Sequence, residues 1–154
     1  CDYTSTTCPT GTFANGTAEC LPLPRCNIST QTSGSHVIPS PGCALSQMIT
    51  VDGTMNVSGV AGESPLRELA AVGGTPDANN PKRHFLVKNG ATLSVSFVKM
   101  TMGKVDTASG TSENNAGGSI FVSEANTKLS VLGVLFNGCG ASINCARRGG
   151  AVYA

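Results

Sequence analysis

The side chains that could carry out acid–base catalysis are few in this sequence and widely separated. Cleavage of a polysaccharide needs either two carboxyl groups that act as acid and base, or a cage of carboxylates that holds calcium. The nine acidic residues are Asp2, Glu19, Asp52, Glu63, Glu68, Asp77, Asp106, Glu113 and Glu124. Whether any of them can meet depends on the elements that position them.

The two histidines and one basic pair are the other candidates for chemistry. His36 lies in a Ser/Pro-rich connector, and His84 stands just before an apolar stretch. We interpret both as surface or packing residues, not as metal ligands or bases. Arg147 and Arg148 are interpreted as a solvated loop pair, with a processing site or an anion contact as the alternatives.

The seven cysteines indicate an oxidising compartment, because a zinc site would need paired CxxC motifs or histidines at ligand spacing. Cys139 and Cys145 flank a tight loop, and we predict that they pair and stabilise it by about 2–3 kcal/mol. Since the count is odd, Cys1 is left free, bonded to another chain, bonded to upstream sequence or lipid-anchored. The other disulfide candidates are Cys8, Cys20, Cys26 and Cys43.

Three N-glycosylation sequons begin at Asn15, Asn27 and Asn56. In an extracellular chain these are credible acceptor sites, and Ser40, between two prolines, is a candidate for O-linked sugar. Covalent glycans are therefore predicted. No catalytic residue, cofactor or metal is assigned, and the expected location is extracellular, either secreted or at the cell surface.

The charge of the chain is sparse and balanced, with 10 Lys and Arg against 9 Asp and Glu. No basic stripe indicates nucleic acid as a partner. No apolar run approaches the roughly eighteen residues of a membrane span, and no signal peptide is visible. The chain is expected to be a mature or excised piece of a secreted protein.

A pattern that repeats about every 35 residues organises the chain, as when the LSV of 93–95 recurs at 129–131. Repeats of this length indicate a solenoid. Four rows of apolar residues are predicted to stack: Ile49, Phe85, Ile120 and Val152; Val51, Val87 and Val122; Met55, Leu93 and Leu129; and Val57, Val95 and Val131.

The apolar alternation slips by one residue at the same place in each copy, after Gly59, Phe97 and Gly133. Such a slip turns side chains to the opposite face of a strand unless the chain bends there, so we predict a corner. Strand, corner, strand and loop make one turn of a parallel β-solenoid. We therefore predict an all-β fold, a short parallel β-helix of about three coils plus a partial fourth.

Four motifs recur in these repeats, a GG[A/S][I/V] strand, a [T/K]LSV strand, an FNG turn and a GGAVY strand. Together they resemble the polymorphic outer-membrane protein repeat and related secreted right-handed parallel β-helix proteins. The resemblance covers 84–154 and, more weakly, 45–60. It implies a right-handed helix in a surface adhesin or structural protein and transfers no catalytic residue. The motifs lie on Gly117, Gly118, Ile120, Leu129, Val131, Phe136, Asn137, Gly149, Gly150, Ala151 and Val152.

Residues 1–43 are rich in Pro, Gly and Thr and lack the apolar alternation of a sheet, so disulfides are expected to hold their shape. The matching positions within 8–26 are Cys8, Pro9, Gly11, Thr12, Cys20 and Cys26. This run resembles the ephrin-receptor-like cysteine-rich module. We therefore divide the chain into a disulfide-rich, irregular N-terminal extension, 1–43, and a β-helix domain, 44–154.

Two loop insertions, 61–83 and 104–116, are predicted within the β-helix domain. Residues 64–72 begin with Ser-Pro and end before two glycines, which predicts a short helix. The polar segment 104–116 is expected on the surface.

A structural role is favoured over an enzymatic one, because no two acidic residues are spaced to stack on neighbouring coils from strand positions. The segment 149–154 stops inside a strand, so either the gene continues with more coils or neighbouring subunits complete the stack. We predict a secreted structural glycoprotein, a subunit of a homopolymeric fibre or surface layer assembled by β-helix stacking or N-terminal arm exchange. The alternative is an adhesin or glycan-binding module that uses loops 61–83 and 104–116.

Overall fold

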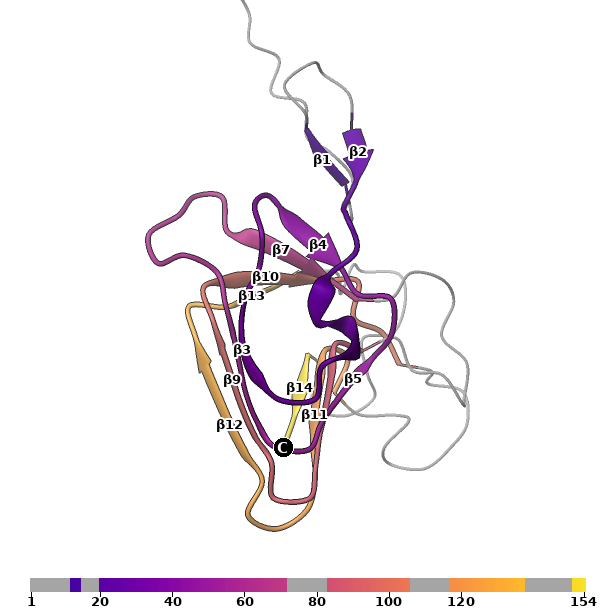
Figure 1. Ribbon diagram of the computed structural model, residues 1–154, viewed down its shortest axis with the longest axis vertical. Coiled ribbons are helices and arrows are strands. Elements are labelled where there is room, and N and C mark those ends of the chain that lie inside the picture. Colours follow the sequence, from indigo (N-terminus) through magenta and orange to yellow (C-terminus); the bar gives the residue numbers. More distant parts are fainter. Residues whose placement is uncertain (1–11, 15–19, 72–82, 106–116, 138–150) are drawn as a thin grey trace, which may run out of the picture.

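The structure, a computed structural model, describes residues 12–14, 20–71, 83–105, 117–137 and 151–154. Three parallel four-stranded sheets surround a common interior, and a short antiparallel hairpin lies outside them (Figure 1). The predicted all-β parallel β-helix with an N-terminal extension is thereby confirmed.

Each sheet gains one strand from every coil. Sheet I consists of β3 (Gly34–Val37), β6 (Thr54–Ser58), β9 (Thr92–Ser96) and β12 (Lys128–Leu132). Sheet II consists of β4 (Gly42–Ala44), β7 (Arg67–Ala70), β10 (Val98–Thr101) and β13 (Leu135–Asn137). Sheet III consists of β5 (Ile49–Val51), β8 (Phe85–Val87), β11 (Ile120–Val122) and β14 (Val152–Tyr153). The hairpin pairs β1 (Thr12–Ala14) with β2 (Cys20–Pro22).

The four apolar rows predicted from the sequence are register rows of the sheets. Ile49 pairs with Phe85 in sheet III, and Met55 pairs with Leu93 in sheet I. The remaining predicted pairs follow in the same registers. The rows are buried from β5 to β11 and become more accessible at Leu129 and Val131 of β12. The predicted three coils therefore correspond to β5–β6–β7, β8–β9–β10 and β11–β12–β13, with β14 as the partial fourth.

The predicted corner joins sheet I to sheet II. Phe97 and Gly133 have φ values of 53° and 60°, and each follows directly on the last residue of a sheet I strand. Gly59 is the corresponding residue one coil earlier, and its N–H donates to the carbonyl of Ser96 at 2.9 Å. The phase slip in the sequence is thus the signature of this bend.

The predicted helix at 64–72 is wrong where the structure describes it, because 67–70 form strand β7. Strand β7 pairs with β4 on one side and β10 on the other, and its Leu69 side chain is fully buried. Pairing within the sheet has overridden the local helix signals. The predicted loop insertion 61–83 therefore contains β7, the sheet II strand of its coil.

Strand β3 and the first two residues of β4 lie within 1–43, the range assigned to the irregular extension. Strand β3 pairs with β6, and β4 pairs with β7, so both are part of the β-helix. The first predicted coil is therefore preceded by two further strands, and β3 is the first of the described strands that belongs to the β-helix.

A short 3-10 helix, η1 (Asn27–Thr30), lies over the interior at the β3–β4 end of the stack (Figure 1). Ile28 of this helix and the preceding Leu23 are buried. The N–H of Cys26 donates to the carbonyl of Ala44 at 2.9 Å, and the N–H of Ala44 donates to the carbonyl of Pro24 at 2.7 Å. This segment therefore covers the first apolar layer and occupies the free edge of β4.

Candidate functional site

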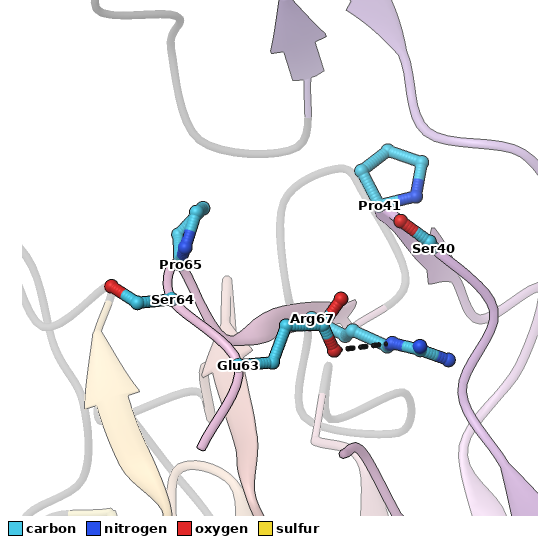
Figure 2. Close-up of a pocket in the computed structure, with 6 residues that line it drawn as sticks. All are labelled: Ser40, Pro41, Glu63, Ser64, Pro65 and Arg67. Carbon is cyan, nitrogen blue, oxygen red and sulfur yellow. Dashed lines mark hydrogen bonds and ion pairs between the residues drawn. The ribbon is translucent and has the colours of Figure 1, made fainter. Parts of the chain in front are cut away.

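A pocket of about 200 Å³ lies at the corner between sheets I and II (Figure 2). Its lining comes from the two connectors that lead into β4 and β7. Glu63 and Arg67 lie on one side of it, close to two Ser-Pro pairs. The lining residues are Ser40, Pro41, Glu63, Ser64, Pro65 and Arg67.

The pocket exists because the same corner is built differently along the stack. In the later coils the turn is short, because Phe97 alone joins β9 to β10, and only Gly133 and Val134 join β12 to β13. In the earlier coils the connectors are longer, and 38–41 and 59–66 stand between the strands of sheets I and II. The register between β4 and β7 brings these two longer connectors next to each other.

The polar wall of the pocket is an ordered ion pair. Arg67 donates from Nε to Glu63 Oε2 at 2.6 Å and from Nη1 to the buried carbonyl of Ile38 at 2.7 Å. Both charged side chains are about one-fifth to one-third exposed, at 19% for Arg67 and 29% for Glu63. The guanidinium is therefore held in one orientation by two partners and still reaches the pocket.

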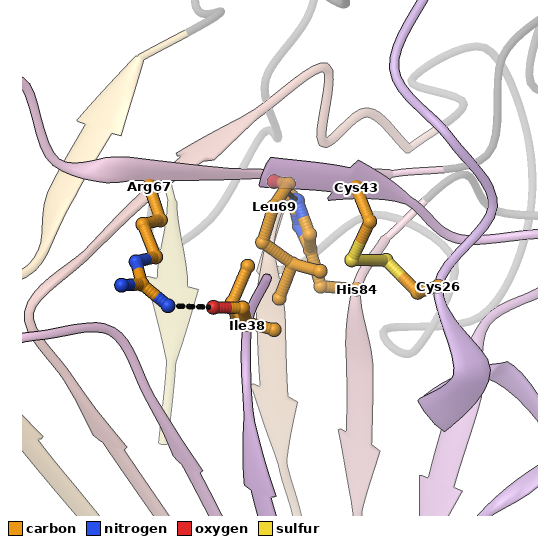
Figure 3. The surroundings of a disulfide bond; sticks show 6 residues. All are labelled: Cys26, Ile38, Cys43, Arg67, Leu69 and His84. Atoms are coloured by element: carbon orange, nitrogen blue, oxygen red, sulfur yellow. Dashed lines mark hydrogen bonds between the residues drawn. A yellow bond between two sulfur atoms is a disulfide. The ribbon is translucent and has the colours of Figure 1, made fainter. Parts of the chain in front are cut away.

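A disulfide fixes the end cap of the stack next to this site. Cys26 and Cys43 are bonded, with their α-carbons 5.0 Å apart, and both are buried (Figure 3). Figure 3 shows the bond near Leu69 and His84, inside the coil. It ties the segment before η1 to β4 and closes a loop with a sequence separation of 17.

The two histidines have the packing and surface roles predicted for them. His84 is fully buried, and its Nε2 donates to the carbonyl of Leu69 at 2.9 Å. Burial lowers the pKa of His84 from 6.5 to about 4, although hydrogen bonds to the backbone at Leu69 and Thr101 oppose the change. His84 is therefore neutral at pH 7. His36 contacts the carbonyl of Ser33 through Nε2 at 2.9 Å.

Three of the described acidic residues, Glu63, Glu68 and Glu124, are held in separate contacts. Glu68 accepts from Thr101 Oγ1 at 2.8 Å and from Lys99 Nζ at 3.2 Å on sheet II. Glu124 accepts from the N–H of Asn89 at 2.7 Å in an exposed turn. Within the described ranges, no three His, Cys, Asp or Glu residues gather in a way that could hold a metal ion. The acids that fall outside those ranges are Asp2, Glu19, Asp77, Asp106 and Glu113.

The predicted modification sites are partly described. Cys20 is disulfide-bonded, as are Cys26 and Cys43. Asn27 is exposed on η1, and Asn56 is exposed on β6, where its Nδ2 donates to Ser35 Oγ at 3.2 Å. The candidates outside the described residues are Cys1, Cys8, Asn15, Cys139, Cys145, Arg147 and Arg148.

The opposite end of the stack presents apolar side chains. Val131 is 40% exposed, Leu132 61% and Leu135 52%, all on β12 or β13. These two strands are the last in sheets I and II, and no described strand pairs with their outer edges. Within the part of the chain that the structure describes, no helix is long and apolar enough to cross a membrane.

Comparison with protein-family models, with curated proteins and with solved structures gave no match to this chain.

Proposed function

We propose that this chain is a secreted structural glycoprotein that self-associates as a subunit of an extracellular fibre or surface layer. The observation that carries the proposal is the contrast between the two ends of the stack. One end is covered by η1, whereas the other exposes Leu132 and Leu135 beside strand edges with which no described strand pairs. Open strand edges with apolar side chains favour addition of another chain.

The first contact of the assembly is the β12–β13 end. Strands of a second copy that add to β12 and β13 continue both hydrogen-bond ladders and cover one side of the exposed Leu132 and Leu135 side chains. The inward rows support this contact, because Leu129 and Phe136 are only partly buried against the core.

The covered end requires a second kind of contact for a polymer. Because the segment before η1 occupies the free edge of β4 and η1 lies over the interior, a copy cannot add there as a simple further coil. The β1–β2 hairpin lies outside the stack (Figure 1), and it is the element we assign to arm exchange with a neighbour. Stacking at one end and arm exchange at the other would together propagate a fibre or layer.

Electron microscopy and peptide mass spectrometry test the two parts of this proposal. Fibres or layers that grow with protein concentration are expected, and a monodisperse monomer at high concentration would contradict self-association. Sugar on Asn27 or Asn56 of the secreted protein is expected as well. If both positions and Asn15 are bare, the protein is not an N-linked glycoprotein.

A further inference from the structure

The pocket at the corner between sheets I and II has hydrogen-bonding groups that the fold does not use. Arg67 donates hydrogen bonds from Nε to Glu63 Oε2 and from Nη1 to the carbonyl of Ile38. Among the described residues, Arg67 Nη2 and Glu63 Oε1 have no hydrogen-bond partner. A donor and an acceptor therefore stand side by side at the pocket, and both belong to charged groups, which make the stronger hydrogen bonds.

The charge of this pair selects against an anionic ligand. Glu63 and Arg67 neutralise each other at a distance of 2.6 Å, so a phosphate or carboxylate that approached Nη2 would also meet the Glu63 carboxylate. A hydroxyl group has no such conflict, because it can accept from the guanidinium and donate to the carboxylate. The pair thus matches a neutral ligand with adjacent hydroxyl groups.

The rest of the lining fits the same kind of ligand. Pro41 and Pro65 supply apolar ring surfaces, and Ser40 and Ser64 add hydroxyl groups. A sugar ring has C–H groups on its faces and hydroxyl groups at its edge, so it can use both kinds of surface. The volume of about 200 Å³ is below the roughly 300–1,000 Å³ of sites for drug-sized ligands, which limits the occupant to about one ring.

We infer that this pocket binds one neutral sugar residue, with Arg67 Nη2 and Glu63 Oε1 contacting adjacent hydroxyl groups. The occupant is either a single sugar or the terminal residue of a longer glycan. This inference goes beyond the proposed assembly and does not depend on it, because the pocket is formed by the β4 and β7 connectors and the assembly contact by β12 and β13.

Saturation-transfer NMR on the full chain measures this binding directly. The probes are the methyl glycosides of glucose, galactose, mannose and N-acetylglucosamine, with methyl glucuronide as the anionic comparison. For a single ring we expect a dissociation constant on the order of 1 mM with at least one neutral probe, and weaker binding of the glucuronide. Tighter binding by oligosaccharides of the preferred sugar would identify a glycan terminus, and equal binding would identify a single sugar.

The variant Glu63→Gln distinguishes specific binding in the pocket from non-specific binding to the protein surface. It removes the carboxylate acceptor and leaves Arg67 with an unbalanced charge, so neutral probes should bind about tenfold more weakly and the glucuronide more tightly. Glu124→Gln is the matched control, because Glu124 also accepts a hydrogen bond but lies in another turn. Ser40→Ala is a second pocket variant that removes no hydrogen bond of the folded chain and should also weaken binding.

Three results would overturn the inference. The first is no saturation transfer to any neutral probe at tens of millimolar ligand. The second is a preference of the unaltered chain for the glucuronide. The third is binding that Glu63→Gln and Ser40→Ala leave unchanged, or that Glu124→Gln weakens equally.

Discussion

The aromatic ring of Phe97 occupies the space that a side chain at Gly133 would need. A β-carbon built on Gly133 would lie 2.8 Å from Phe97 Cδ1, and Gly133 has a φ of 60°. These are the corner residues of successive coils, so the corner stacks an aromatic ring against a bare backbone. The contact explains why glycine follows phenylalanine at this position of the repeat.

Replacing Gly133 by alanine should therefore destabilise the fold in two ways. The left-handed backbone conformation and the contact with Phe97 together should lower the free energy of unfolding by about 2–3 kcal/mol. Chemical denaturation measures the change. Gly62→Ala is the matched control, since Gly62 has a φ of 79° with nothing within 4 Å of its β-carbon position, and it should cost only about 1 kcal/mol. Equal costs for both variants would show that the Phe97 contact contributes nothing.

Burial of His84 should make the stability depend on pH. Its pKa is about 4 in the folded chain and 6.5 as the reference value, so between these pH values the unfolded chain binds a proton that the folded chain does not. Protonation of His84 in the unfolded chain should therefore lower the free energy of unfolding by about 3 kcal/mol as the pH drops from 7 to 4. This contribution of His84 should level off below pH 4.

Denaturation curves of the unaltered chain and of His84→Gln, measured between pH 4 and 7, test this expectation. The variant should lose most of this pH dependence, whereas His36→Gln, at a surface position, should keep it. An NMR titration that places the pKa of His84 near 6.5 would rule the explanation out.

The disulfide between Cys26 and Cys43 should contribute about 3 kcal/mol to the free energy of unfolding, on the loop-entropy estimate for a sequence separation of 17. The double variant Cys26→Ser, Cys43→Ser removes it. Because the bond holds the η1 cap over the first apolar layer, hydrogen exchange should rise first in β3 and β4. A uniform rise over all strands, or no loss of stability, would contradict this local role of the disulfide.

The inward rows and the corner could be predicted because each produces a pattern that can be recognised in the sequence without the structure. Stacking of identical strand positions gives rows such as Met55, Leu93 and Leu129, and the bend shifts the alternation after Phe97. Both features are local and repeated, so several copies reinforce one interpretation.

Strands β3, β4 and β7 could not be predicted in the same way. Gly34–Val37 has little apolar alternation of its own and is a strand because β6 pairs with it. The residues of Arg67–Ala70 have strong helix propensity, which pairing with β4 and β10 overrides.

The pocket could not be predicted from the sequence for the same reason. Ser40-Pro41 and Ser64-Pro65 repeat one dipeptide, and that recurrence was the available signal. The recurrence indicates a shared pocket only once the register of β4 against β7 is known to bring the two connectors together. The ion pair of Glu63 with Arg67 likewise depends on the course of the connector before β7.

Val37 provides a control position for testing self-association through Leu132 at the β12–β13 end. Val37 and Leu132 occupy the same outward column of sheet I, which runs from Val37 through Ser58 and Ser96 to Leu132. Val37 is 64% exposed at the covered end, and Leu132 is 61% exposed at the open end. A charged residue at either position should disturb the fold to a similar, small extent.

Sedimentation velocity over a range of concentrations is the most direct test of this contact. The unaltered chain and Val37→Lys should both shift to larger species as concentration rises. Leu132→Lys and Leu135→Lys should each weaken association by at least about tenfold, because they place a charge where apolar surface is buried. If the unaltered chain stays monomeric, or if Val37→Lys weakens association as much as Leu132→Lys, the β12–β13 end is not the assembly contact.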